Sequence, residues 1–92
     1  MTVAPPPTDN LQLVENIRSR QLPPRAHRKK IREAADATIS EVATACGVSY
    51  FSVWAWEKPD GAIEPRLVHR IAYRKVLDAL QALAQELDAA QK

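Results

Sequence analysis

The chain has 92 residues, which is enough for one folded domain and too few for two. Apolar residues make up 46% and charged residues 26%, an ordinary balance for a globular protein. Gly occurs only twice, whereas Ala and Leu are abundant, and this favours helices over strands. The single cysteine, Cys46, excludes an internal disulfide. Since we find neither a signal peptide nor an apolar run of about 20 residues, we expect a cytoplasmic protein.

Positive charge is concentrated in one part of the sequence, although the formal net charge is only +2 and the pI is about 8.9. Between residues 18 and 32 there are seven basic side chains and no acidic one. These basic residues are Arg18, Arg20, Arg25, Arg28, Lys29, Lys30 and Arg32. Residues 76–92 carry three acidic side chains and one basic one. Such a basic region attracts polyanions, and the alternative is a merely solvated helix face.

The first half of the chain predicts a tail followed by two helices. Residues 1–8 contain three consecutive prolines and are expected to be disordered. Asp9 or Asn10 caps a helix that ends near Arg20, ahead of a pair of prolines. A second helix begins at Pro24 and runs to about Ala35. Its expected inner face consists of Ala26 or His27, Ile31, Ala34 and Ala35.

The second half of the chain predicts two short helices and one long helix. Thr38-Ile39-Ser40-Glu41 has the form of a capping box, so a helix covers 39–46 and stops at Gly47. Ser49 caps a second short helix over 50–57, and residues 58–61 form a turn. A long helix is expected over 65–91. Its apolar stripe, at near-heptad spacing, consists of Leu67, Ile71, Val76, Leu80, Leu83 and Leu87.

Two short helices joined at Gly47 suit a helix-turn-helix, whose second helix enters the major groove of DNA. Gly47 permits the tight turn because it carries no Cβ. The residues expected to pack the two helices together are Val42, Ala43, Cys46, Val48, Val53 and Trp56. Trp54 lies two residues from Trp56, so it points elsewhere and is expected to be exposed.

These residues resemble the phage repressor and Cro superfamily, whose members are often called XRE-like. The family pattern has an Arg in a first helix, then Thr/Ser-x-x-Glu-Leu-Ala, Gly-Val-Ser and Ile/Val-x-x-Trp-Glu. It is matched here by Arg32, 38–43, 47–49 and 53–57. Leu22-Pro23-Pro24 and Pro65-Arg66 are also similar to small helix-turn-helix regulators of actinobacteria and their phages.

The resemblance implies an all-α, lambda-repressor-like helix-turn-helix bundle, to which the sequence adds an extra N-terminal helix and one long C-terminal helix. The single domain would cover residues 9–92, with the helix-turn-helix over 38–57. Arg32 and Glu57 match a structural ion pair of the family. The positions that touch base edges are matched by Tyr50, Phe51, Trp54 and Ala55. The positions near phosphate are matched by Thr38, Ile39, Ser49, Ser52, Lys58 and Arg66.

Two further sets of basic residues lie near the motif. From the basic region, phosphate contacts are expected from Arg25, Arg28 and Lys29. On the long helix, Arg66, Arg70 and Arg74 recur every four residues and form one stripe. That stripe is compatible both with phosphate contact and with pairing to acidic neighbours such as Asp60 or Glu64.

The sequence departs from the family pattern in two respects. Tyr50, Phe51 and Trp54 stand where Gln, Arg, Ser or Asn is usual, and Ile39 stands where a polar residue is common. Aromatic side chains make no bidentate contacts with guanine or adenine, so specificity would depend on thymine methyls, DNA shape and phosphate positioning. One long C-terminal helix also replaces the two short helices of the family.

We therefore expect a transcriptional regulator of repressor or Cro type that binds double-stranded DNA on the nucleoid of a bacterial or phage-infected cell. Two alternatives stay open: a scaffold whose aromatic face binds a protein, such as an antirepressor or antitoxin, and a low-specificity architectural DNA binder. The leucine stripe can pack on the helix near 11–17, cover the domain or pair with itself, and we expect a homodimer. We expect no enzyme, cofactor, metal site or small-molecule effector, because the required motifs are missing.

Overall fold

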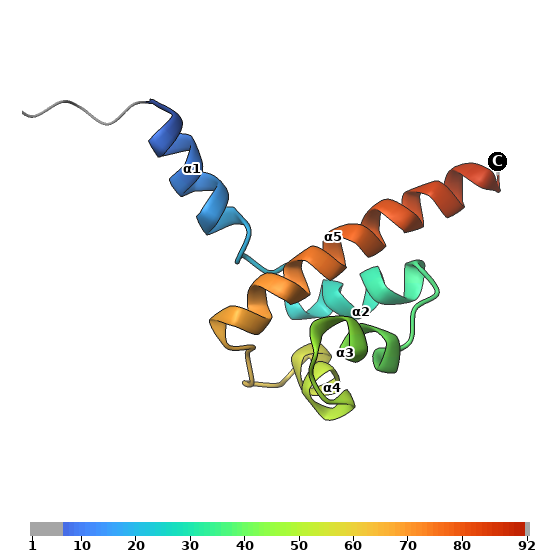
Figure 1. Cartoon of the computed structure of the whole chain (residues 1–92). Coiled ribbons are helices and arrows are strands. Elements are labelled where there is room, and N and C mark those ends of the chain that lie inside the picture. The colour runs from blue at the N-terminus through green and yellow to red at the C-terminus, as the bar shows by residue number, and fades with distance from the viewer. Residues whose placement is uncertain (1–6, 92) are drawn as a thin grey trace, which may run out of the picture.

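The computed structural model describes residues 7–91, which contain five α-helices joined by turns and loops and no strand (Figure 1). The helices are α1 (Pro7–Arg18), α2 (Arg25–Ala34), α3 (Ile39–Cys46), α4 (Tyr50–Glu57) and α5 (Leu67–Ala90). The all-α expectation is therefore confirmed. The bounds of α2 to α5 lie within two residues of those predicted from the sequence.

Helix α1 begins and ends earlier than predicted. It starts at Pro7, so residues 7 and 8, which we expected in the tail, are helical. Proline fits the first turn of a helix, because the N–H that it lacks would have no partner within the helix. The helix ends at Arg18 rather than near Arg20. Residues 1–6, which form the rest of the expected tail, and residue 92 lie outside the described part of the chain.

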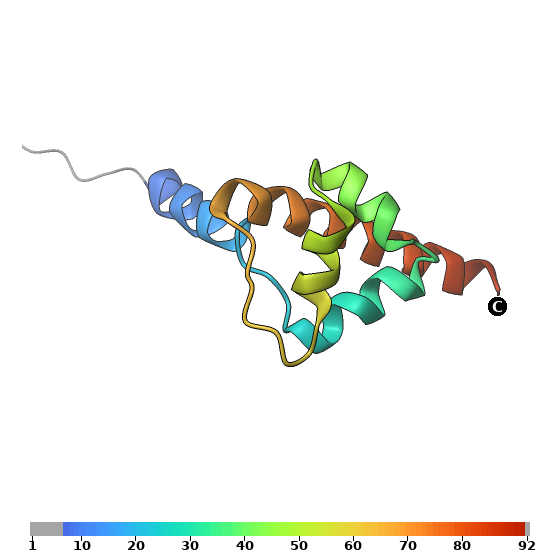
Figure 2. The same cartoon turned by 90° about the horizontal axis from the view of Figure 1, so that it is seen from below.

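Helix α5 lies across α2 and α3, and α4 packs below them, away from the far end of α5 (Figures 1 and 2). The core lies where α3, α4 and α5 meet. Its buried side chains are Val42, Ala43, Cys46, Val53, Trp56, Tyr73 and Leu77. The rings of Trp56 and Tyr73 contact each other, with centroids 4.9 Å apart and planes inclined by 42°. The packing of α3 on α4 that the sequence predicted is thus part of a core that α5 completes.

Residues in the left-handed conformation end both α2 and α3. Gly47 has a φ of 71°, and the N–H of the next residue donates to the Ala43 carbonyl at 3.0 Å. Asp36 has a φ of 58°, and the N–H of the next residue donates to the Arg32 carbonyl at 3.1 Å. Both are Schellman motifs, which satisfy the last carbonyls of a helix. The sequence indicated the stop at Gly47 but not the one at Asp36, because Asp adopts this conformation less readily than Gly.

The buried face of α2 differs from the one that we predicted. The buried residues of α2 are Arg28 and Arg32, and Ala35, which directly follows the helix, is also buried. Of the other residues expected inside, Ile31 is half-buried, and those that are exposed are Ala26, His27 and Ala34. The prediction failed because a guanidinium group can be buried when carboxylate and carbonyl oxygens accept its N–H groups.

The outer parts of α1 and α5 project from this body (Figures 1 and 2). Helix α5 has 24 residues and spans about 36 Å at 1.5 Å per residue. Its buried side chains, Tyr73 and Leu77, lie in its first half, whereas Leu83 and Leu87 are 40% and 39% exposed. The exposed apolar side chains of α1 are Leu11, Leu13, Val14 and Ile17. Within the predicted stripe, Val76 and Leu80 pack against the core and Ile71 is half-buried, whereas Leu67, Leu83 and Leu87 remain accessible, as does the apolar face of α1.

Opposite substitutions test the backbone conformation at the two helix ends. Gly47→Ala is expected to lower the free energy of unfolding by about 1 kcal/mol. Nothing lies within 4 Å of an added Cβ, so the left-handed backbone is the source of this loss. Asp36→Gly is expected to raise the free energy of unfolding by up to about 1 kcal/mol, because glycine relieves the same strain. Urea denaturation followed by circular dichroism measures both, and an unchanged Gly47→Ala variant would contradict the first expectation.

Candidate nucleic-acid interface

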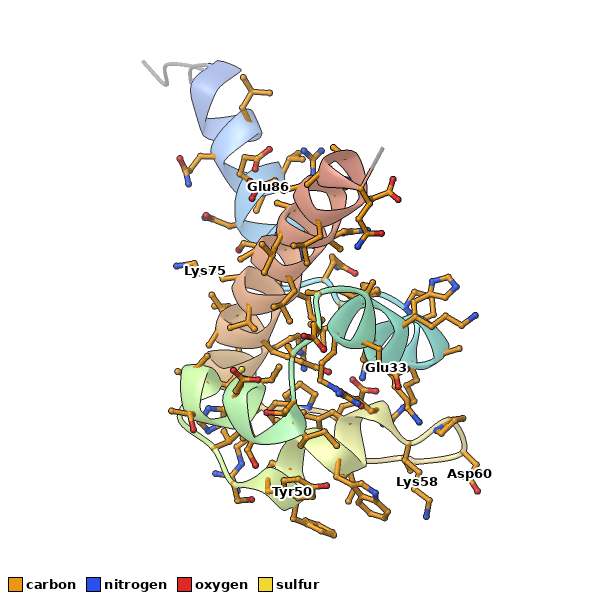
Figure 3. All side chains as sticks on the ribbon, turned by 90° about the vertical axis from the view of Figure 1, so that its right-hand side faces the viewer. Glu33, Tyr50, Lys58, Asp60, Lys75 and Glu86 are labelled. Carbon is orange, nitrogen blue, oxygen red and sulfur yellow. The ribbon has the colours of Figure 1, made fainter. Side chains whose placement is uncertain are left out.

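Three aromatic side chains of α4 point into solvent, and we call them the aromatic patch. Tyr50, Phe51 and Trp54 are 55%, 60% and 42% exposed, respectively. The rings of Phe51 and Trp54 contact each other, with centroids 5.5 Å apart and planes inclined by 32°. Figure 3 shows Tyr50 at the lower edge of the molecule, far from Glu86 near the end of α5. The patch therefore lies at the opposite end of the molecule from the projecting part of α5.

The packing of α4 determines which of its residues face solvent. Val53 and Trp56 are buried in the core, and Glu57 is buried at the end of the helix. Ala55, which we expected to touch base edges, is 3% exposed. Its carbonyl accepts a hydrogen bond from Arg25 Nη1 at 3.0 Å, so the Arg25 side chain lies against this part of α4. We correct the assignment of Ala55 for this reason, because a buried side chain cannot reach a base edge.

One cation lies beside the aromatic patch. Lys58 follows α4 directly and is exposed. Its Nζ lies 5.5 Å from the centroid of a Trp54 ring, within the range of a cation–π interaction. In Figure 3 Lys58 and Tyr50 lie along the same lower edge of the molecule. A positive charge thus accompanies the patch at a position that the sequence associated with phosphate.

The helix α3 begins with the capping box that the sequence predicted. The N–H of Thr38 donates to Glu41 Oε1 at 2.9 Å, and the N–H of Glu41 donates to Thr38 Oγ1 at 3.1 Å. The bonds from the Thr38 backbone and side chain lower the pKa of Glu41. The stability that the carboxylate contributes through these bonds is therefore present at neutral pH and is lost when acid protonates it.

Four of the predicted phosphate contacts lie at the starts of α3 and α4, and their groups already have partners within the chain. Thr38 is engaged in the capping box, and Ile39 is partly buried against the core. At α4, the N–H of Ser52 donates to Ser49 Oγ at 3.2 Å, and the two hydroxyl oxygens lie 3.1 Å apart. Thr38 and Ser49 are nevertheless exposed, whereas Ile39 and Ser52 are half-buried. Thr38 and Ser49 are thus the members of this group best placed to meet a ligand.

Arg25 and Arg28, which we predicted to contact phosphate, bind the protein itself. Arg28 is 5% exposed, and it donates to the Pro23 carbonyl at 2.9 Å and to the Trp56 carbonyl at 3.0 Å. Arg25 donates to several carbonyls of the end of α4 and the following loop, which belong to Ala55, Trp56, Lys58 and Ile63. We therefore correct both assignments. The two guanidinium groups hold α4 and its loop against α2 instead of facing solvent.

Glu64 completes this arginine cluster from the loop before α5. Its carboxylate lies 2.8 Å from Arg25 Nη2 and 3.2 Å from Arg28 Nη2. From the sequence, Glu64 was an acidic neighbour available to the arginines of α5. The structure brings it instead to two arginines of α2, more than 30 residues away in the chain. No local spacing in the sequence indicates such a long-range partnership.

Arg32 and Glu57 form a buried ion pair with two contacts, which joins α2 to α4. Arg32 Nε lies 2.7 Å from Glu57 Oε2, and Arg32 Nη2 lies 3.0 Å from Oε1. Both residues are buried, and the hydrogen bond to Glu57 raises the pKa of Arg32. Arg32 Nη1 also donates to the Ala37 carbonyl at 2.9 Å. The ion pair implied by the family resemblance is therefore present in the structure.

Of the other basic side chains considered in the sequence analysis, some are exposed and others bind groups of the protein itself. Lys29 and Arg66 are exposed, as a phosphate contact requires. Arg70 donates to a carbonyl just before α5 at 3.4 Å. Arg74 pairs with Asp78 at 2.9 Å and donates to carbonyls at the end of α1 and just after it. Arg70 and Arg74, the second and third residues of the stripe, thus make hydrogen bonds within the protein.

Comparisons with known proteins identify no relative of this chain. No family model matches this chain, and no match is found among curated proteins or solved structures. Within residues 7–91, no three His, Cys, Asp or Glu side chains gather in a group that could hold a metal ion. No described helix combines the length and apolar character needed to cross a membrane. The function must therefore be inferred from the geometry of the chain itself.

The Arg32–Glu57 pair allows a direct test of what holds α4. Glu57→Ala leaves the Arg32 guanidinium buried without its carboxylate, so the free energy of unfolding is expected to fall by about 3–5 kcal/mol. The double variant Arg32→Met/Glu57→Met removes both charges and is expected to recover most of that loss. Glu33→Ala, which removes an exposed acid of α2, serves as the control and should change little. If the double variant were no more stable than Glu57→Ala, an uncompensated charge would not explain the loss.

Proposed function

We propose that this chain is a sequence-specific transcriptional regulator of repressor or Cro type that binds double-stranded DNA. In this proposal α3 and α4 form a helix-turn-helix of the lambda-repressor-like kind, and α4 lies in the major groove. The observation that supports it is the aromatic patch, which leaves one face of a short helix accessible next to a second helix and a glycine turn. A major groove about 12 Å wide admits one α-helix presented in this manner.

Exposed cations supply the attraction to the phosphate backbone that such a protein needs, and Lys58 is the one that lies beside the patch. Lys58 lies at the end of α4, Arg66 precedes α5, and Lys29 lies on the solvent side of α2. With Thr38 and Ser49, they are the phosphate contacts that we retain from the sequence. Arg25 and Arg28 are excluded from this role, because their guanidinium groups are bound within the protein.

The projecting half of α5 supports a homodimer as the binding unit. Val76, Leu80, Leu83 and Leu87 follow one another at intervals of four, three and four residues, the heptad spacing of paired helices. A hollow of about 210 Å³ opens at the base of this seam, lined partly by Leu80 and Leu83. The flanking positions Ala79 and Ala84 are uncharged, whereas Glu86 carries a charge, so like-charge repulsion between two such seams is confined to the outer end of the seam. A dimer with two outward patches would read an inverted repeat.

A second candidate function follows from the same patch. Exposed aromatic side chains also mark protein–protein interfaces, so the patch fits docking of a protein partner. Selection of duplexes from a random pool separates the possibilities. A defined consensus sequence supports the regulator, affinity without a consensus indicates an architectural DNA binder, and no binding at low salt leaves the protein partner.

Two exposed lysines provide a matched test of the DNA-binding face. Lys58 lies beside the patch and Lys75 lies toward the opposite end of the molecule (Figure 3). Lys58→Ala is expected to weaken binding to all duplexes alike and to reduce the slope of log K against log salt by about 1. Lys75→Ala should leave both quantities unchanged. Fluorescence anisotropy with labelled duplexes over a series of salt concentrations measures them, and equal effects of the two variants would contradict the proposed orientation.

The dimer proposal predicts the behaviour of two charge variants of α5. Leu83→Glu/Leu87→Glu places charges on the exposed seam and is expected to convert a dimer into a monomer in sedimentation experiments. Ala82→Glu/Ala89→Glu adds the same charge beside the seam and should sediment as the unmodified chain does. A monomeric unmodified chain, or dissociation of both variants, would rule out this seam as the interface.

A further inference from the structure

The outward face of α4 is chemically unusual for a surface that reads polar base edges. Residues 50–56 read Tyr-Phe-Ser-Val-Trp-Ala-Trp and contain no Arg, Lys, Asn, Gln, Asp or Glu. Glu57, the last residue of α4, is buried in its ion pair with Arg32. Arg and Lys make paired hydrogen bonds to guanine, Asn and Gln make them to adenine, and Asp and Glu accept a hydrogen bond from cytosine. The face that α4 presents is therefore unable to recognise a base by these hydrogen bonds.

The hydroxyl groups beside this face are partly engaged with each other. The hydroxyls of Ser49 and Ser52 lie 3.1 Å apart, and Ser49 Oγ also accepts from the Ser52 N–H. The Lys58 ammonium group lies over a ring of Trp54. Apart from this charge, what the patch offers to a ligand is the apolar surface of two rings in contact, Phe51 and Trp54. The Tyr50 hydroxyl adds one polar group at its side.

The major groove contains one kind of apolar group, the 5-methyl group of a pyrimidine. An aromatic ring placed over the polar edge of an unmodified G·C pair would remove water from donors and acceptors without replacing it, and this is unfavourable. A ring placed over a methyl group removes apolar surface from water, and this is favourable. The chemistry of the patch therefore selects base pairs that carry a methyl group.

We infer that the aromatic patch recognises pyrimidine 5-methyl groups in the major groove, with Phe51 and Trp54 as the contacting rings. This inference rests on the proposed function and specifies what that site reads. Thymine and 5-methylcytosine both carry this methyl group, so either is a possible source. Burial of one methyl group corresponds to about a fourfold gain in affinity.

The test uses the full chain and the tightest-binding duplex selected from a random pool. Each thymine of that duplex is replaced in turn by deoxyuridine, which removes only the methyl group. Affinity is expected to fall about fourfold at each contacted position. At the same positions, a 5-methylcytosine duplex is expected to bind about fourfold more tightly than its cytosine counterpart. The tighter of the thymine and 5-methylcytosine duplexes identifies the source of the methyl group.

Variants of the patch connect the effect to particular rings. Phe51→Ala and Trp54→Ala should each abolish the difference between thymine and uracil at the position that the ring covers. Leu11→Ala, which shortens a comparably exposed apolar side chain on α1, should preserve every difference. Equal affinity for thymine and uracil at all positions would overturn the inference while leaving DNA binding intact. Failure to bind any duplex at low salt would instead overturn the proposed function.

Discussion

The attachment of α4 to α2 by three arginine side chains is the interaction on which the rest of the structure depends. Arg32 forms a buried ion pair with Glu57, the last residue of α4. Arg28 and Arg25 donate to carbonyls at the end of the same helix and pair with Glu64 in the loop that follows. Guanidinium groups suit this task, because their planar arrays of N–H groups bind several oxygens at once. We call Arg25, Arg28 and Arg32 the arginine clamp, because together they hold the end of α4 against α2.

This clamp determines which side of α4 faces solvent. With the end of the helix held inward, Val53 and Trp56 enter the core formed with α3 and α5. The remaining side of a helix of only eight residues carries Tyr50, Phe51 and Trp54. The exposure of three large aromatic side chains is therefore a consequence of buried charges elsewhere. It also explains why the surface proposed to meet DNA has few cations of its own, since those of α2 are largely occupied.

The local features of this fold could be predicted from sequence, whereas the long-range ones could not. Thr38 and Glu41 form a capping box and Gly47 permits a left-handed turn, so neighbouring residues alone set the limits of α3. Trp54 and Trp56 differ by two positions, which suffices to place one outside and one inside. By contrast, no pattern in the sequence distinguishes Arg28, which is buried, from Lys29, which is exposed. The burial of Arg28 depends on the Trp56 carbonyl, 28 residues away, and Arg25 in the same way binds the Ala55 carbonyl, 30 residues away.

The two tryptophans provide the most informative measurement on the intact chain, because their indole N–H groups give separate signals in a ¹H–¹⁵N spectrum. Trp54 lies in the exposed patch and Trp56 in the core. Addition of the tightest selected duplex should shift and protect the Trp54 signal and leave that of Trp56 nearly unchanged. A Trp54 signal that stays constant while the duplex is bound would show that α4 does not meet DNA.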